Sequence, residues 1–253
     1  MGEHVAPTTP AKKKRSNIFW NIVGVVGELL ITFAFIVGLF SVWQLYWTTY
    51  EVAGQVSQTI ASYEESHQPS KRTLGEVRTD DPPAFDREVG DGEVYGLVHV
   101  PTWDWMKIPL AEGTTSYVLD QGWAGHYDMT TQPGGVGNFS VAGHRRTYGN
   151  NFRWIDRLTQ GDKVVVEVDD HYLVYSMVSS EIIDATDPTQ MRVVAPVIDD
   201  VSWSETPTER WMTMTTCHPE YGNWQRYIVH LKFESWTPKD TGVPAELVDE
   251  PTN

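Results

Sequence analysis

An uninterrupted apolar segment near the N-terminus constrains this chain more than any other feature. Residues Leu29 to Trp47 contain no charged side chain, and a helix of roughly 20 such residues crosses the hydrocarbon core of a bilayer. Apolar residues, interrupted by Glu28, extend back to Ile18, and Trp43 and Trp47 supply the aromatic side chains that are typical of a membrane interface. The pattern predicts a transmembrane helix over residues 18–47.

A basic cluster, Lys12 to Arg15, precedes the apolar segment. A cleaved signal peptide has a shorter apolar core that ends in small residues, whereas this segment is long and ends in bulky aromatic side chains. We therefore expect an uncleaved, single-pass anchor in the lipid bilayer of the cell membrane. The positive-inside rule places residues 1–17 in the cytoplasm and everything after Trp47 outside the cell.

The exterior part divides by composition. With 40% hydrophobic and 21% charged residues among 253, the chain is long enough for one sizeable domain and a non-globular portion. We expect a short helix and a flexible stalk over residues 48–92, a globular domain over 93–236, and an acidic flexible tail over 237–253. The net charge of −15 argues against nucleic acid as a partner.

Short strand-like runs dominate the globular part. Alternating apolar residues between turn signals predict strands over 94–100, 138–144, 163–168, 172–178, 211–217 and 226–233. Short helical pieces are expected over 114–119, 152–158 and 188–194. Many short strands with brief helical insertions indicate a mainly β fold, a small closed or nearly closed barrel.

Cys217 is the only cysteine of the chain. Paired cysteines outside the cell are oxidised, so a lone thiol there indicates an intermolecular link or a reactive group, unless it is simply a buried hydrophobe. With the strand period of two, Cys217 shares a face with Thr213 and Thr215, opposite Met214. Pro219 cannot continue a central strand, so Cys217 is predicted at a strand end, where reactive groups are usually displayed.

A reactive thiol needs a basic neighbour, because the thiolate is the nucleophile. Among the eight histidines, His144 is the best candidate, since it closes a strand-like run and a polar loop follows it. His4 and His67 fall in segments expected to be disordered or part of the stalk, and His218 is predicted to point away from the thiol. The remaining histidines are interpreted as surface or hydrogen-bonded structural positions: His99, His126, His171 and His230.

Arg226 is the third candidate. It belongs to the polar face of its strand, and a guanidinium beside Cys217 would donate hydrogen bonds to an oxyanion; a solvated surface arginine is the alternative. Arg145, Arg146 and Arg210 have no comparable link to the cysteine strand. A single cysteine cannot supply the paired spacing of cysteine-based zinc sites, and no phosphate loop or dinucleotide fingerprint occurs. We expect no metal and no cofactor.

The run from Thr213 to Cys217, Thr-Met-Thr-Thr-Cys, followed by Arg226, resembles the Thr-Leu-x-Thr-Cys motif of the sortases. These are membrane-anchored cysteine transpeptidases of Gram-positive bacteria. The extension Cys217-His218-Pro219-x-Tyr221 and the stretch 141–149 are most similar to the class E sortases of actinobacteria. The similarity covers residues 93–233 and implies a closed eight-stranded sortase-type β-barrel with short helices.

The resemblance also implies roles for individual residues. The catalytic set would be Cys217, His144 and Arg226, and the substrate-binding candidates are Thr216, Thr213 and Tyr148. Cys217 would cleave a Leu-Pro-x-Thr-Gly-like or Leu-Ala-x-Thr-Gly-like sorting signal of a secreted protein between Thr and Gly through a thioacyl intermediate. His144 would protonate the leaving amine and later help to deprotonate the incoming one, and Arg226 would bind the substrate and the oxyanion. An amine of a peptidoglycan precursor would accept the secreted protein.

Two alternatives stay open. A pilus-polymerising sortase would use a lysine of another pilin as the amine. Such enzymes often carry a lid with an Asp-Pro-aromatic motif, to which the stretch from Asp81 to Phe85 is loosely similar. A non-catalytic, membrane-tethered barrel that binds wall components would need no thiol at all.

Overall fold

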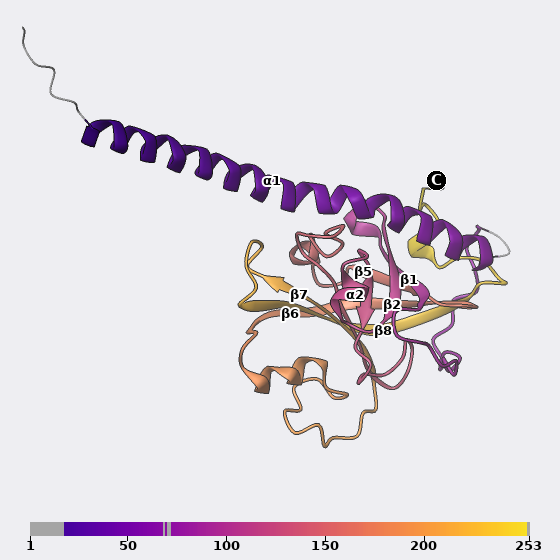
Figure 1. The fold of residues 1–253 in the computed structure, drawn as a ribbon. Helices are drawn as coiled ribbons and strands as arrows, with labels where there is room; N and C mark the ends of the chain where they lie inside the picture. The colour runs from indigo at the N-terminus through magenta and orange to yellow at the C-terminus, as the bar shows by residue number, and fades with distance from the viewer. Residues whose placement is uncertain (1–17, 68, 70–71, 252–253) are drawn as a thin grey trace, which may run out of the picture. The chain divides into compact units, whose positions relative to one another are not determined.

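The computed structural model describes residues 18–67, 69 and 72–251, and the chain divides into two units, Met1–Trp43 and Gln44–Asn253. Helix α1 runs from Ile18 to His67 and begins in the first unit (Figure 1). The transmembrane segment and the short helix expected after it are therefore one continuous helix. The predicted cytoplasmic segment 1–17, with its basic cluster and His4, lies outside the described residues.

The first unit, as described, is the beginning of α1. Its large apolar side chains, from Phe19 to Trp43, are exposed. Within the described residues α1 is the one helix that is long and apolar enough to cross a membrane, judged by length and composition. A helix that is apolar on all sides and is not covered by protein is typical of a membrane span.

The second unit contains a closed barrel, as the sequence predicts. In the described part of the chain the strands are β1 (Val94–Val100), β2 (Met106–Glu112), β3 (Ala124–His126), β4 (Gly137–Ala142), β5 (Lys163–Glu167), β6 (His171–Asp184), β7 (Arg210–His218) and β8 (Gln225–Pro238). Their order around the barrel is β1-β2-β3-β4-β7-β8-β6-β5. The β2–β3 and β4–β7 pairs are parallel, and the other neighbouring pairs are antiparallel.

Short helical segments connect the strands. They are η1 (Pro101–Trp103), α2 (Ser116–Leu119), η2 (Ile155–Arg157), η3 (Pro188–Val194) and η4 (Ala245–Leu247). Three of them fall where the sequence predicts helical pieces, and η3 has the predicted bounds. At its start the carboxylate of Asp187 accepts a hydrogen bond from the backbone N–H of Thr189, the usual capping arrangement at a helix N-terminus.

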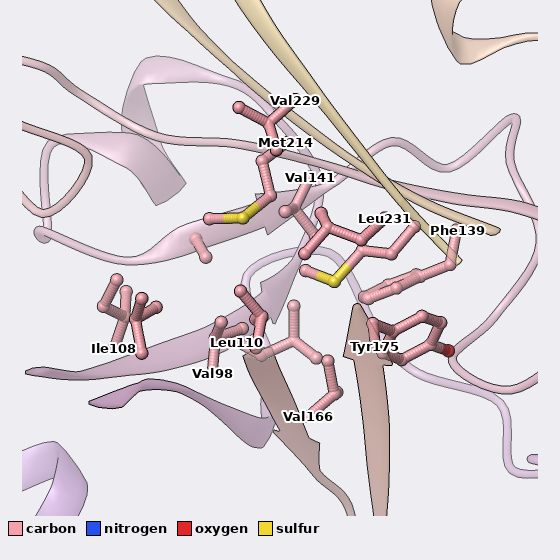
Figure 2. Close-up of a cluster of buried hydrophobic side chains, with 14 of the residues drawn as sticks. Val98, Ile108, Leu110, Phe139, Val141, Val166, Tyr175, Met214, Val229 and Leu231 are labelled. Carbon is pink, nitrogen blue, oxygen red and sulfur yellow. The ribbon is translucent and has the colours of Figure 1, made fainter. Parts of the chain in front are cut away.

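The barrel interior fixes the register of the strands that carry the candidate residues. Met214, Val229 and Leu231 are fully buried, and Figure 2 shows their side chains directed toward one another with Val141 and Phe139. Burial of one such side chain stabilises the fold by about 1.5–3 kcal/mol. A shift of β7 by one residue would turn Met212 and Met214 outward, so the opposite face of β7, which carries Cys217, must point out of the barrel.

A second layer covers part of that outer face. Val193 and Val194 of η3 pack with Ile183 and Ile228. The side-chain amide of Asn138 donates to the carbonyls of Val193 and Ala195, at 3.0 and 3.1 Å. The connection between β6 and β7 is therefore held against the outside of β4 and β8.

The sequence missed β2 and β3. Strand β2 contains Pro109, which lies opposite Leu97 in the β1–β2 pair, and a proline lowers the strand signal. Strand β3 has three residues, one of them Gly125. Both strands exist because neighbouring strands need partners to close the barrel, and a short window of sequence does not contain that requirement.

The stalk and the tail contact the barrel, which differs from the flexibility expected from their composition. Leu74 bridges to Val243 and Arg78 bridges to Trp236. In the tail, Val243 and Leu247 are buried in a small apolar cluster on the outside of β5 and β6. A few apolar anchors of this kind are enough to order segments that are otherwise polar.

Candidate active site

Cys217 lies at the end of β7, as predicted, and is partly exposed. It stands directly opposite Arg226 of β8 in the antiparallel pair. Side chains of such cross-strand partners lie on one face of the sheet with Cβ atoms about 4.5–5.5 Å apart. The structure thus places the thiol and the base of the guanidinium side chain next to each other on the outer face of the barrel.

The guanidinium of Arg226 is held by two backbone carbonyls, one in the β7–β8 connection and one at the start of β8. Its Nη1 donates to the carbonyl oxygens of Asn223, at 2.7 Å, and of Gln225, at 2.9 Å. These are charge-to-dipole hydrogen bonds rather than an ion pair with a carboxylate. The positive charge is therefore not neutralised by these partners and could bind a negatively charged group beside Cys217.

His144 follows β4 and reaches the same edge of the barrel. Because β4 and β7 are parallel, their carboxyl ends lie at the same side of the sheet. Two hydrogen bonds join these ends: Gly143 N–H donates to the carbonyl of Thr215 at 3.1 Å, and the Thr216 hydroxyl donates to the carbonyl of Gly143 at 2.6 Å. The residue before His144 is therefore bonded to the residue before Cys217.

The imidazole of His144 has a carboxylate partner that the sequence analysis missed. Its Nε2 lies 2.8 Å from Oδ1 of Asp120, and the ring of Tyr148 lies 5.4 Å from the imidazole, centroid to centroid. Asp120 directly follows α2. The sequence places α2 correctly but contains no local signal that brings its end to His144.

The three substrate-binding candidates lie in different surroundings. Thr216 is buried between the two strand ends, and Tyr148 lies beside His144 with a φ of 47° in the connection after β4. Thr213 is fully buried, and its hydroxyl is hydrogen-bonded to Asn138 and His230 at 2.8 and 2.9 Å. The structure brings Thr216 and Tyr148 to the site, whereas it places Thr213 beneath η3.

The other arginines considered from the sequence have partners of their own. Arg145 donates to Nδ1 of His218 at 2.8 Å and pairs with Asp156. It is therefore hydrogen-bonded to the last residue of β7. Arg146 pairs with Glu220. Arg210 pairs with Asp81 at 3.0 Å. Burial, together with the charge of Arg145, lowers the pKa of His218, which keeps that imidazole a neutral acceptor.

A pocket of about 200 Å³ opens beside Arg226 on the face that carries Cys217. Its lining is mostly apolar and includes Ile183, Met191, Val194 and Ile228. At one side the hydroxyl groups of Tyr127 and Thr215 are hydrogen-bonded at 2.9 Å. Burial raises the pKa of the Tyr127 phenol, which therefore remains a neutral hydrogen-bonding group at physiological pH.

The site combines a partly exposed thiol, an imidazole at the adjacent strand end, a guanidinium on the facing strand and a mostly apolar pocket on one side. A family model, the Sortase domain, matches residues 98–234 and spans all three candidate catalytic residues. The chain belongs to the sortase family. Members of this family are cysteine transpeptidases, so the predicted enzyme class and the predicted barrel are both confirmed.

Two relatives of this sortase come from Streptomyces coelicolor. Sortase SrtE1 of Streptomyces coelicolor is 36% identical over 229 residues, 88% of this chain and 60% of the relative; this chain thus spans 60% of that protein's length. Sortase SrtE2 of the same organism is 31% identical over 223 residues, 86% of this chain and 84% of the relative. The predicted similarity to class E is confirmed.

Solved structures agree with this assignment. The SrtA sortase from Actinomyces oris has a TM-score of 0.64 at 43% identity and covers 70% of this chain and 100% of that one. The crystal structure of sortase E1 from Streptomyces coelicolor with a tripeptide in the active site has a TM-score of 0.55 at 38% identity, over 63% of this chain and 99% of that one.

Proposed function

We propose that this sortase is a membrane-anchored transpeptidase that cleaves a Leu-Ala-x-Thr-Gly-like or Leu-Pro-x-Thr-Gly-like sorting signal between Thr and Gly. It transfers the secreted protein that carries the signal to an amine of a peptidoglycan precursor. The observation that carries the proposal is the position of Cys217 opposite Arg226, at a strand end bonded to the residue before His144.

The chemistry follows from these three side chains. The Cys217 thiolate attacks the carbonyl carbon of the signal's Thr, and Arg226 donates hydrogen bonds to the oxyanion that forms. When the tetrahedral species collapses, the carbon–nitrogen bond breaks and His144 gives its proton to the leaving Gly amine. The incoming amine then attacks the thioacyl carbon, His144 takes a proton from that amine, and the Cys217 sulfur leaves.

The pocket beside Arg226 supports a peptide substrate. Its apolar lining, which includes Ile183 and Ile228, suits the small apolar side chains that precede Thr in such a signal. The hydroxyl of Tyr127 gives the pocket a polar group that can bond to a peptide backbone. The tripeptide in the active site of sortase E1, at 38% identity, is further support for a peptide ligand.

The anchor supports a place at the cell surface. We propose that residues 1–17 are cytoplasmic, that residues 18–47 of α1 span the membrane, and that the catalytic domain, residues 93–236, lies outside. The length and composition of α1 fit a span, and the basic cluster before it sets the direction of insertion.

Of the alternatives, the pilus-polymerising enzyme receives less support. Phe85 packs against Tyr95, with ring centroids 5.3 Å apart, and Asp81 pairs with Arg210. None of these residues lines the pocket beside Arg226, so the segment similar to a lid contacts another part of the barrel. Membership of the sortase family argues against a non-catalytic wall-binding barrel.

The test uses the full chain in detergent with short Leu-Ala-x-Thr-Gly and Leu-Pro-x-Thr-Gly peptides and triglycine as the amine. We expect mass spectrometry to detect a thioacyl adduct on Cys217 and a peptide joined to triglycine through its Thr. The matched Cys217→Ala variant should yield neither product. If folded wild-type protein cleaves neither peptide, the proposed substrate class is wrong.

A further inference from the structure

We propose that Asp120 is the positioning residue of His144. Its carboxylate accepts the Nε2–H of the imidazole, sets the ring tautomer and leaves Nδ1 free to exchange the proton of the transfer reaction. This inference rests on the proposed function, in which His144 is the acid and base.

The contact itself carries the first part of the argument. Nε2 of His144 and Oδ1 of Asp120 are 2.8 Å apart, and the two side chains are 25% and 33% exposed. An ionised carboxylate can only accept hydrogen bonds, so the ring nitrogen that faces it must carry the hydrogen. Nδ1 has no hydrogen-bond partner among the described residues, which leaves it as the accepting nitrogen of the neutral ring.

The turn that carries Asp120 is fixed by packing. Val118 of α2 is fully buried, and the backbone N–H of Asp120 donates to the carbonyl of Ser116. These contacts hold the backbone of Asp120 while its side chain stays available to His144.

Gly122, two residues on, allows this turn to touch the connection that follows His144. It has a φ of +77°, and a Cβ at that position would lie 3.1 Å from the carbonyl oxygen of Tyr148. The side-chain amide of Asn151 donates to the carbonyl of Gly122 at 3.2 Å. The segments on which Asp120 and His144 lie are therefore joined directly.

Helix α1 supports both segments from the other side. Val52 is 7% exposed. Its Cγ2 lies 3.4 Å from where a Cβ of Gly149 would be and 3.7 Å from where one of Gly122 would be. Val56 approaches Gly122 more closely, at 2.9 Å from the same point. The part of α1 in the second unit thus packs on the two segments that bring Asp120 to His144.

The proposed role follows the proton through one turnover. The Cys217 sulfur forms a bond to the Thr carbonyl carbon, the carbon–nitrogen bond breaks, and the proton on Nδ1 of the imidazolium moves to the leaving amine nitrogen. Asp120 keeps its hydrogen bond to Nε2–H throughout and stabilises the imidazolium before the transfer. Without the carboxylate, the ring can populate the other tautomer or rotate, and fewer molecules hold His144 ready for the reaction.

The kinetic test compares Asp120→Ala and Asp120→Glu with Asp128→Asn in the full chain. Asp128 is a matched control because it is an exposed carboxylate on the connection after β3. We expect Asp120→Ala to lower kcat for peptide transfer about tenfold or more, with KM within about twofold of wild type, because the residue acts on proton transfer rather than on substrate binding. Asp120→Glu should recover part of the activity, and Asp128→Asn should match wild type.

A second measurement needs no substrate. ¹⁵N NMR of histidine-labelled protein, with His144 assigned from a His144→Gln variant, should show the Nε2–H tautomer in wild type and a mixture in Asp120→Ala. If Asp120→Ala does not fold, Asp120→Asn carries the kinetic test, because it keeps the shape and removes the charge that stabilises the imidazolium; kcat equal to that of Asp128→Asn would then contradict the proposal.

The outcomes separate the two proposals. Wild-type protein that leaves both peptides intact, yet shows the change of tautomer in the variant, would contradict the proposed function and support the role of Asp120. Active wild-type protein whose Asp120→Ala variant matches Asp128→Asn in both kcat and ¹⁵N signals would overturn the role of Asp120.

Discussion

Two histidines of this sortase differ in how many carboxylates they contact and in how deeply they are buried. His144 has one carboxylate partner, Asp120, and both side chains are partly exposed. His99 on β1 has two, because its Nε2 lies 2.9 Å from Glu167 and its Nδ1 lies 2.8 Å from Glu250, all three being buried. With both ring nitrogens bonded, His99 has no free position for proton exchange, whereas His144 keeps Nδ1 available. The comparison separates a histidine that supports the fold from one that can carry chemistry.

The charged groups around His99 explain why its pKa is raised. Burial by itself would lower the pKa of His99, but the hydrogen bonds to Glu167 and Glu250 outweigh it and raise the pKa to about 9. Lys239 pairs with Glu167 at 2.7 Å, and Lys107 pairs with Glu250 at 3.1 Å. This buried network fastens the end of the chain to β1.

A cavity of about 250 Å³ lies beside His99 and exceeds the pocket beside Arg226 in volume. Its charged lining residues, including Glu167 and Glu250, are already paired with one another or with lysines. Size alone therefore does not identify the substrate site, and we propose the smaller pocket, which Arg226 lines, as that site.

The largest effect is expected at His144, the histidine proposed to be catalytic. His144→Gln should lower kcat for peptide transfer by about 10²–10⁴-fold, the usual contribution of a general acid and base, and should leave the melting temperature close to that of wild type. Peptide transfer followed by mass spectrometry and a thermal melt of the same sample measure both quantities. A variant that keeps wild-type kcat would assign the proton transfer to another group.

The matching change at the other histidine should act on stability. His99→Gln removes the cation that bonds both Glu167 and Glu250 and leaves these buried carboxylates with Lys239 and Lys107 alone; loss of one partner of a buried ion pair costs about 3–5 kcal/mol. Chemical denaturation should show this loss, while kcat of the folded fraction should stay near wild type. A large fall in kcat with unchanged stability would mean that the two clusters have been assigned the wrong roles.

The pH dependence of stability sharpens the same comparison. The pKa of His99 is raised from 6.5 to about 9 on folding, so its contribution is fully present below pH 6.5 and is lost as the pH rises through about 9. The pKa difference corresponds to about 3 kcal/mol. Denaturant midpoints of wild type should fall between pH 6.5 and 9, and those of His99→Gln should fall much less. Equal slopes would contradict a charged His99.

The smallest effect is expected at the helix that supports the active-site segments. Val52→Ala removes apolar contact with the turns at Gly122 and Gly149, which should cost about 1–2 kcal/mol of stability and lower kcat by a few-fold. Gln55→Ala, at an exposed position of the same helix, is the control and should change neither. If the two variants behave alike, α1 does not help to position Asp120.

Much of the site could be predicted because its signals are local. The alternation from Thr213 to Cys217 assigns the faces of β7, and Pro219 marks its end. The polar position of Arg226 on its strand is equally visible. Asp120 could not be predicted in this way, because its contact with His144 depends on how α2 is placed by β2 and β3, two strands that were themselves missed.

By itself, the sequence determined the apolar N-terminal helix, the mainly β domain, the single thiol at a strand end and the resemblance to sortases, because these follow from composition, period and short motifs. Only the tertiary structure decided that β4 and β7 pair in parallel, which joins Gly143 to Thr216. It also decided that Asp120 meets His144 and that the stalk and tail lie on the barrel. The physical reason is that these contacts join residues far apart in the chain, and they form only when strand pairing closes the barrel and a few buried side chains fix its register.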